Sequence, residues 1–157
     1  MSVLNRAVLS QCMKVYRISA ITLKVKEMEK SRSLYSKIPG FRVTYGGETS
    51  DSFTTFELGE GTKATTYLNL ERIEGDEGSF DFSKKLNLGK TRGSEDFGRV
   101  IFHTENVDKL YSYMKQDEYI SKYVVFENEP ANAPWGERFF HIREPNGYQL
   151  SFAKPLF

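Results

Sequence analysis

Two histidines have the most chemical potential in this chain, because imidazole can bind a metal ion or transfer a proton near neutral pH. His103 and His141 are the only histidines among the 157 residues. His103 follows Arg99 by four residues, roughly 13 Å along an extended strand, and could converge with Glu57 or Glu137 into an unusual metal site. A lone histidine on a strand is more often a satisfied polar group than a metal ligand, so a structural role stays open.

His141 belongs to a segment that reads as two strands joined by a tight turn. Residues 137–143 alternate and are rich in aromatic side chains, as in a half-buried strand. Residues 144–147 read Glu-Pro-Asn-Gly, in which proline fixes φ and Asn-Gly tolerates positive φ. Residues 148–153 alternate again. The pattern predicts a β-hairpin that closes a sheet.

The order of predicted elements is the same in both halves of the chain. The first half reads as a strand at 14–25, a helix at 28–38 and strands at 41–45, 52–58 and 63–70. The second reads as a strand at 99–104, a helix at 107–116 that Asn106 can cap, a strand at 122–128 and the two hairpin strands.

The two halves also align as an internal repeat. Ile21 to Val25 matches Val100 to Thr104 at an offset of 79 (100 − 21), and Leu68 to Leu70 matches Leu150 to Phe152 at an offset of 82 (150 − 68). Each helix covers one sheet face, so polar and mixed residues should line the other face. Two such sheets joined by their curvature would enclose a cleft.

Composition narrows the possible partners. The formal net charge is +1 and the basic residues form no stripe, so neither nucleic acid nor a membrane is an expected partner. The single cysteine, Cys12, excludes an internal disulfide and suits a reducing compartment, so a cytoplasmic location is expected.

We expect four segments along the chain. They are an N-terminal extension (1–14), a first module (15–70), a linker between the modules (71–98) and a second module (99–157). The linker is charged and rich in glycine, which fits a disordered loop or a flap over a pocket.

Several motifs, together with the repeat, resemble the vicinal oxygen chelate superfamily, which includes glyoxalase I, bleomycin-resistance proteins and extradiol dioxygenases. The motifs are Pro-Trp-Gly-Glu-Arg at 134–138, Arg-Glu-Pro-Asn-Gly at 143–147, and Tyr-Ser-Lys-Ile-Pro-Gly-Phe at 35–41. The resemblance covers about residues 16–156. It implies an α+β fold in which two βαβββ modules form a curved, open eight-stranded mixed sheet around a cleft, with the helices on the outer face.

The resemblance also implies four positions for metal ligands, one on the first and one on the last strand of each module. These positions hold Ala20, Asn69, Arg99 and Ser151. None is a histidine or a carboxylate, and an arginine cation would repel a divalent ion. We therefore expect no metal and no other cofactor, with a divalent metal as the alternative.

Three functions follow from the resemblance. The first is a metal-free protein that binds a small organic molecule in the cleft, similar to bleomycin-resistance proteins, through Thr22, Phe53, Asn69, Arg99, His103, Trp135, Phe139, His141 and Ser151. The second is a glyoxalase-like lyase or isomerase, or a dioxygenase, that uses a metal or acid–base chemistry at His141 or Glu57. The third is a structural or interaction protein with a filled cleft. A homodimer is expected in each case.

Overall fold

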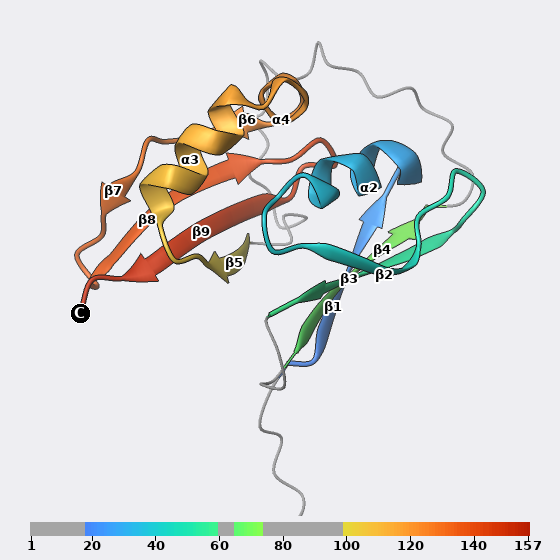
Figure 1. The fold of residues 1–157 in the computed structure, drawn as a ribbon, viewed down its shortest axis with the longest axis horizontal. Helices are drawn as coiled ribbons and strands as arrows, with labels where there is room; N and C mark the ends of the chain where they lie inside the picture. Colours follow the sequence, from blue (N-terminus) through green and yellow to red (C-terminus); the bar gives the residue numbers. More distant parts are fainter. Residues whose placement is uncertain (1–17, 60–64, 74–98) are drawn as a thin grey trace, which may run out of the picture.

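The structure, a computed structural model, describes residues 18–59, 65–73 and 99–157. Two α+β units follow one another along the chain and form a four-stranded and a five-stranded sheet (Figure 1). This arrangement confirms the predicted fold class of paired βαβββ modules. The predicted N-terminal extension at 1–14 and most of the predicted linker lie outside the described residues.

The first unit contains one helix and four strands. In chain order these are β1 (Ala20–Val25), α2 (Met28–Ser36), β2 (Arg42–Gly46), β3 (Phe53–Leu58) and β4 (Thr66–Arg72). The strands lie in the order β1-β4-β3-β2, with β1 parallel to β4. Strand β4, which comes last in this unit's sequence, is thus an inner strand of the sheet.

The second unit repeats this plan with additions. Its elements are β5 (Arg99–His103), α3 (Val107–Gln116), α4 (Glu118–Tyr123), β6 (Val125–Phe126), β7 (Ala131–Asn132), β8 (Glu137–Arg143) and β9 (Gln149–Pro155). The strand order is β5-β9-β8-β6, β5 is parallel to β9, and β7 pairs with β8.

The predicted strand at 122–128 is wrong over its first part. Asp117 caps a short helix there, because its Oδ1 accepts hydrogen bonds from the backbone N–H groups of Tyr119 (3.0 Å) and Ile120 (2.9 Å). The Ile120 side chain is fully buried and holds this turn against the core. Only Val125–Phe126 remains as a strand, paired with β8.

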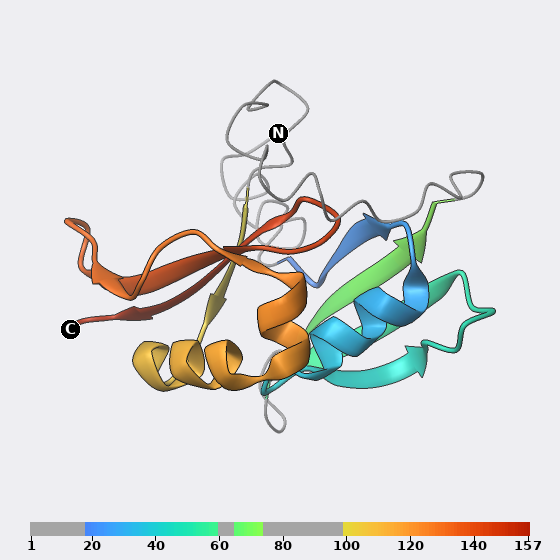
Figure 2. The same cartoon turned by 90° about the horizontal axis from the view of Figure 1, so that it is seen from above.

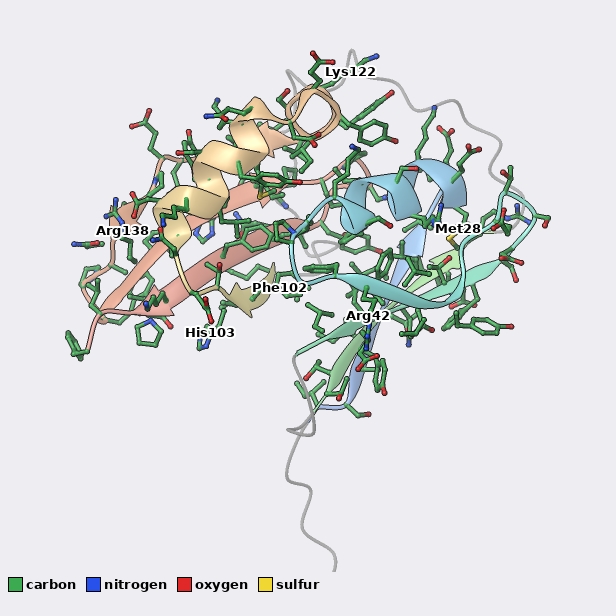
Figure 3. The ribbon with its side chains drawn as sticks, in the orientation of Figure 1. Met28, Arg42, Phe102, His103, Lys122 and Arg138 are labelled. Carbon is green, nitrogen blue, oxygen red and sulfur yellow. The ribbon has the colours of Figure 1, made fainter. Side chains whose placement is uncertain are left out.

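One hydrophobic core runs under the helices of both units. Helices α2, α4 and α3 lie next to one another, and the buried apolar residues of both sheets belong to one cluster with those of the helices (Figure 2). Phe41 of the first unit meets Phe102 of β5 edge to face, with ring centroids 5.1 Å apart. Phe102 lies where the two units meet (Figure 3). In the described part of the chain, no helix is long and apolar enough to cross a membrane.

The turn between β8 and β9 fastens the second unit to the first. Asn146 accepts a hydrogen bond from the backbone N–H of Lys26 (3.0 Å) and donates one to Ser31 Oγ (3.2 Å). The Tyr148 hydroxyl accepts from the backbone N–H of Lys24 and donates to its carbonyl, both at 3.0 Å. The Glu144 carboxylate accepts from the Asn146 side chain (2.9 Å) and the Tyr148 backbone (3.1 Å), so it orients both residues.

The Tyr148→Phe variant should be less stable than the wild type by about 1–2 kcal/mol, because it loses one donor and one acceptor at the junction of the units. Chemical denaturation measures the difference. Tyr67→Phe is the matched control, since Tyr67 lies exposed on β4 and should tolerate the loss of its hydroxyl. Equal stabilities of the two variants would contradict this role of Tyr148.

Candidate ligand site

The candidate site lies on the face of the second sheet that is turned away from the helices. Strand alternation sends Val100, Phe102, Phe140 and Phe152 into the core, and their neighbours to the opposite face. His103 points away from α3 on this open face (Figure 3). The predicted site residues that share the face are Arg99, His103, Phe139, His141 and Ser151.

Arg99 and His141 meet across the central strand β9. Arg99 Nη1 lies 3.2 Å from His141 Nε2, although β5 and β8 are each paired to β9 and not to each other. Ser151 of β9 is in register with both His141 and Ile101, and is 3% exposed. These three predicted residues therefore form one polar cluster.

Burial and the contact with Arg99 together determine the protonation of His141. Burial lowers the pKa of His141, and the Arg99 cation lowers it further, so the imidazole is neutral at pH 7. Arginine has no acceptor atom, so Nε2 accepts from Arg99 and the proton is on Nδ1. Among the described residues, the buried Nδ1 has no hydrogen-bond partner. The site thus contains an N–H donor that has no acceptor in the described part of the chain.

A second polar network lies next to this cluster on the open face of the second sheet. Arg143 Nε donates to Glu127 Oε1 (2.9 Å), Arg143 Nη1 donates to the Gly147 carbonyl (3.0 Å), and Gln149 donates to Glu127 Oε2. Burial alone would raise the pKa of Glu127, but the hydrogen bonds from Gln149 and Arg143 lower it overall. Glu127 is therefore ionised at neutral pH and neutralises Arg143.

Glu127 and Asn128 also hold the backbone of His141. Glu127 N–H donates to the His141 carbonyl (3.0 Å), and the Asn128 side chain accepts from the His141 N–H (2.8 Å). The sequence reading missed both residues, because nothing in their local pattern shows which strand they will contact. They act on the site by fixing the position of β8.

Aromatic rings extend the site along β8. The Phe139 ring lies 4.7 Å from the His141 ring and 5.9 Å from the Trp135 ring, which is stacked on it. Trp135 is 66% exposed, and its Nε1 donates to Glu137 Oε2 (3.0 Å). Glu137 Oε1 also lies 3.7 Å from His103 Nε2. We call the rings of Trp135, Phe139 and His141 the aromatic strip.

The remaining predicted site residues lie on the open face of the first sheet, each with its own contacts. Asn69 donates to Thr22 Oγ1 (3.3 Å). The Glu57 carboxylate accepts a hydrogen bond from Arg42 (2.7 Å), so this candidate acid–base group is already paired with a cation. Phe53 lines an open hollow of about 530 Å³ together with Lys24, Ser52, Glu71, Arg72 and Ile73. Each contact joins residues of the first unit.

The four positions implied for metal ligands occupy equivalent places in the two sheets. Ala20 pairs with Tyr67, two residues before Asn69, and Arg99 pairs with Gln149, two residues before Ser151. Their side chains do not fit a divalent metal: alanine offers no donor atom, and the guanidinium of Arg99 is a cation. Within the described residues, no three His, Cys, Asp or Glu side chains gather as a potential metal site.

Two βαβββ units with helices on one side and an open polar face on the other define the class of protein. Residues 17–152 match the Glyoxalase/Bleomycin resistance protein/Dioxygenase superfamily. This chain belongs to that superfamily. No curated protein matches it in sequence.

Solved structures share the fold at low sequence identity. A glyoxalase/bleomycin resistance protein/dioxygenase from Nocardioides is 19% identical, with a TM-score of 0.58 and coverage of 98% of this chain and 93% of that chain. Lactoylglutathione lyase from Agrobacterium tumefaciens is 14% identical, with a TM-score of 0.59 and coverage of 89% and 94%. TioX from Micromonospora sp. ML1 is 14% identical, with a TM-score of 0.57 and coverage of 90% and 100%. At these identities the similarity shows the fold alone.

Proposed function

We propose that this protein binds a small organic molecule on the open face of its second sheet, without a metal ion. The observation that carries the proposal is the contact between Arg99 and His141. It places the exposed Arg99 cation on the open face, at a position where the superfamily usually has a metal ligand, with one of its N–H groups held by His141 Nε2. A ligand with an anionic acceptor group would pair with the remaining N–H groups of Arg99.

The same geometry favours binding over acid–base catalysis. The lone pair of His141 Nε2 is directed at Arg99, so it is not available to take a proton from a substrate. Glu57 is held in an ion pair with Arg42. A lyase, isomerase or dioxygenase activity would need groups other than these two.

We place the protein in the cytoplasm as a homodimer. The single Cys12 supports a reducing compartment. Modules of this superfamily often pair across chains, which supports the dimer.

Metal analysis and thermal unfolding with a panel of metabolites test the proposed function. We expect the purified protein to contain less than stoichiometric metal, and at least one compound to raise the melting temperature. A ligand present at 100 times its dissociation constant stabilises the folded state by about 2.7 kcal/mol. Stoichiometric nickel, zinc, iron or manganese would contradict the proposal.

Arg99→Ala and His141→Ala should abolish this rise in melting temperature. Arg138→Ala is the matched control, because Arg138 is also on β8 but faces the helices, where it contacts Asp108 at 2.6 Å. This control should keep the response to the ligand. An unchanged response in Arg99→Ala would place the ligand elsewhere.

A further inference from the structure

We propose that the ligand is a planar aromatic monocarboxylate, with its carboxylate on Arg99 and its ring against the aromatic strip. This inference rests on the proposed function and adds the chemical class of the ligand. Three features carry it: the charges on the open face, the rings beside Arg99, and the acid at the far end of the strip.

On the open faces of the two sheets, as far as the structure describes them, Arg99 is the cation that has no carboxylate partner. In residues 18–59, 65–73 and 99–157, its polar side-chain contact is with the neutral His141, and no carboxylate lies within salt-bridge distance of it. The other described cations on the two open faces are paired: Arg143 with Glu127 at 2.9 Å, Lys24 with Glu71 at 2.6 Å and Arg42 with Glu57 at 2.7 Å. One uncompensated charge fits one carboxylate.

The guanidinium keeps donors for an anion while it contacts His141. Only Nη1 is used in that contact, and a guanidinium has five N–H groups in a planar fork that suits a carboxylate. The remaining N–H groups can therefore bind a carboxylate while the contact with His141 is kept.

The apolar surface next to Arg99 is flat and aromatic. Phe139 lies between His141 and Trp135, and the stacked Trp135 ring is 66% exposed. Phe139 and His141 are two residues apart on β8, roughly 7 Å along the strand. A ring against Phe139 would thus hold a directly attached carboxylate near Arg99. Offset stacking on these rings favours an aromatic ligand over a saturated one.

Glu137 limits the negative charge that a ligand can carry at the other end of the aromatic strip. It accepts from Trp135 Nε1 at 3.0 Å, so its carboxylate lies beside the outermost ring. A second carboxylate on the ligand at that end would meet a like charge. The site therefore selects a monoanion over a dianion.

Isothermal titration with four matched probes tests the ligand class. The probes are 2-naphthoate, 2-naphthamide, decahydro-2-naphthoate and 2,6-naphthalenedicarboxylate. We expect 2-naphthoate to bind at least about tenfold more tightly than each of the other three, as expected for a charge-assisted contact combined with ring stacking. Binding of 2-naphthamide that equals or exceeds binding of 2-naphthoate would overturn the inference.

Variants assign the two parts of the ligand to their residues. Arg99→Ala should remove the preference for 2-naphthoate over its amide, whereas Phe139→Leu should remove the preference for 2-naphthoate over decahydro-2-naphthoate. Arg138→Ala, on the helix side of β8, should change neither preference. A preference for the acid that survives in Arg99→Ala would contradict the assignment.

The probe set separates failure of the inference from failure of the proposed function. If other metabolites raise the melting temperature through Arg99 and His141 while 2-naphthoate does not bind, the ligand class is wrong and the proposed function stands. If neither the probes nor the metabolites bind, both are wrong.

Discussion

The Glu144→Gln variant is expected to keep its stability between about pH 4.5 and pH 7, whereas the wild-type protein becomes less stable over this interval because Glu144 ionises. Glu144 is 2% exposed, in the turn that fastens the second unit to the first. Burial raises the pKa of its carboxyl to about 7, although hydrogen bonds from Asn146 and Tyr148 act in the opposite direction. Burial also raises the pKa values of the nearby Tyr35 and Tyr148, so both phenols are neutral in this pH interval.

The raised pKa makes the folded state bind a proton more tightly than the unfolded state. The stabilisation from this proton is complete below about pH 4.5, the ordinary value for glutamate, and is lost as the pH rises through about 7. A shift of this size corresponds to about 3 kcal/mol. Glutamine carries no ionisable proton, so the variant lacks this change.

Urea denaturation at a series of pH values measures the effect. The stability of Glu144→Gln relative to the wild type should rise by about 3 kcal/mol between pH 4.5 and pH 7.5. Glu129→Gln is the matched control, because Glu129 is exposed, and its relative stability should stay nearly constant. A constant difference for Glu144→Gln as well would show that the folded protein does not raise the pKa of Glu144.

Phe102→Ala is expected to lower the free energy of unfolding by about 3 kcal/mol, near the lower end of the range for buried phenylalanines because Phe102 is partly buried. Its ring stacks on Phe152 (5.6 Å) and meets Phe41 edge to face (5.1 Å). The contact with Phe152 lies within the second unit, and the contact with Phe41 joins the two units. Loss of the Phe102 ring therefore weakens the hydrophobic core where the two units meet.

The wild-type protein should unfold in one cooperative transition, because both units share this core. Fluorescence and circular dichroism during urea denaturation test this, and Phe102→Ala should shift the midpoint to lower urea. Phe157→Ala is the control, since Phe157 is fully exposed. If both variants unfold at the same midpoint, Phe102 does not join the two cores.

Local patterns predicted the elements that depend on near neighbours. The helix at Val107–Gln116 has the predicted bounds, since Asn106 caps it through a hydrogen bond with the Lys109 N–H (2.9 Å). β8 at Glu137–Arg143 also agrees, because alternation over seven residues is a strong signal. The internal repeat appears in the structure as the same register between the first and last strands of each unit, with Ala20 opposite Tyr67 and Arg99 opposite Gln149.

Features that depend on distant residues could not be predicted in this way. The backbone contacts of Glu127 and Asn128 with His141 join residues 14 and 13 positions apart (141 − 127 and 141 − 128). The contact of Arg99 with His141 spans 42 positions and requires the placement of β9 between their strands. Sequence alternation predicted a polar face away from the helices that includes Arg99, but not which side chains touch on it.

The place of β9 has a consequence for synthesis on the ribosome. Both β5 and β8 pair with β9, which ends at Pro155. A growing chain can close its first sheet once Arg72 has left the exit tunnel, because β4 is then free to pair with β1 and β3. The partners of β5 on β9 are Gln149 to Ala153, so translation leaves β5 incompletely paired until fifty residues after its end (153 − 103 = 50).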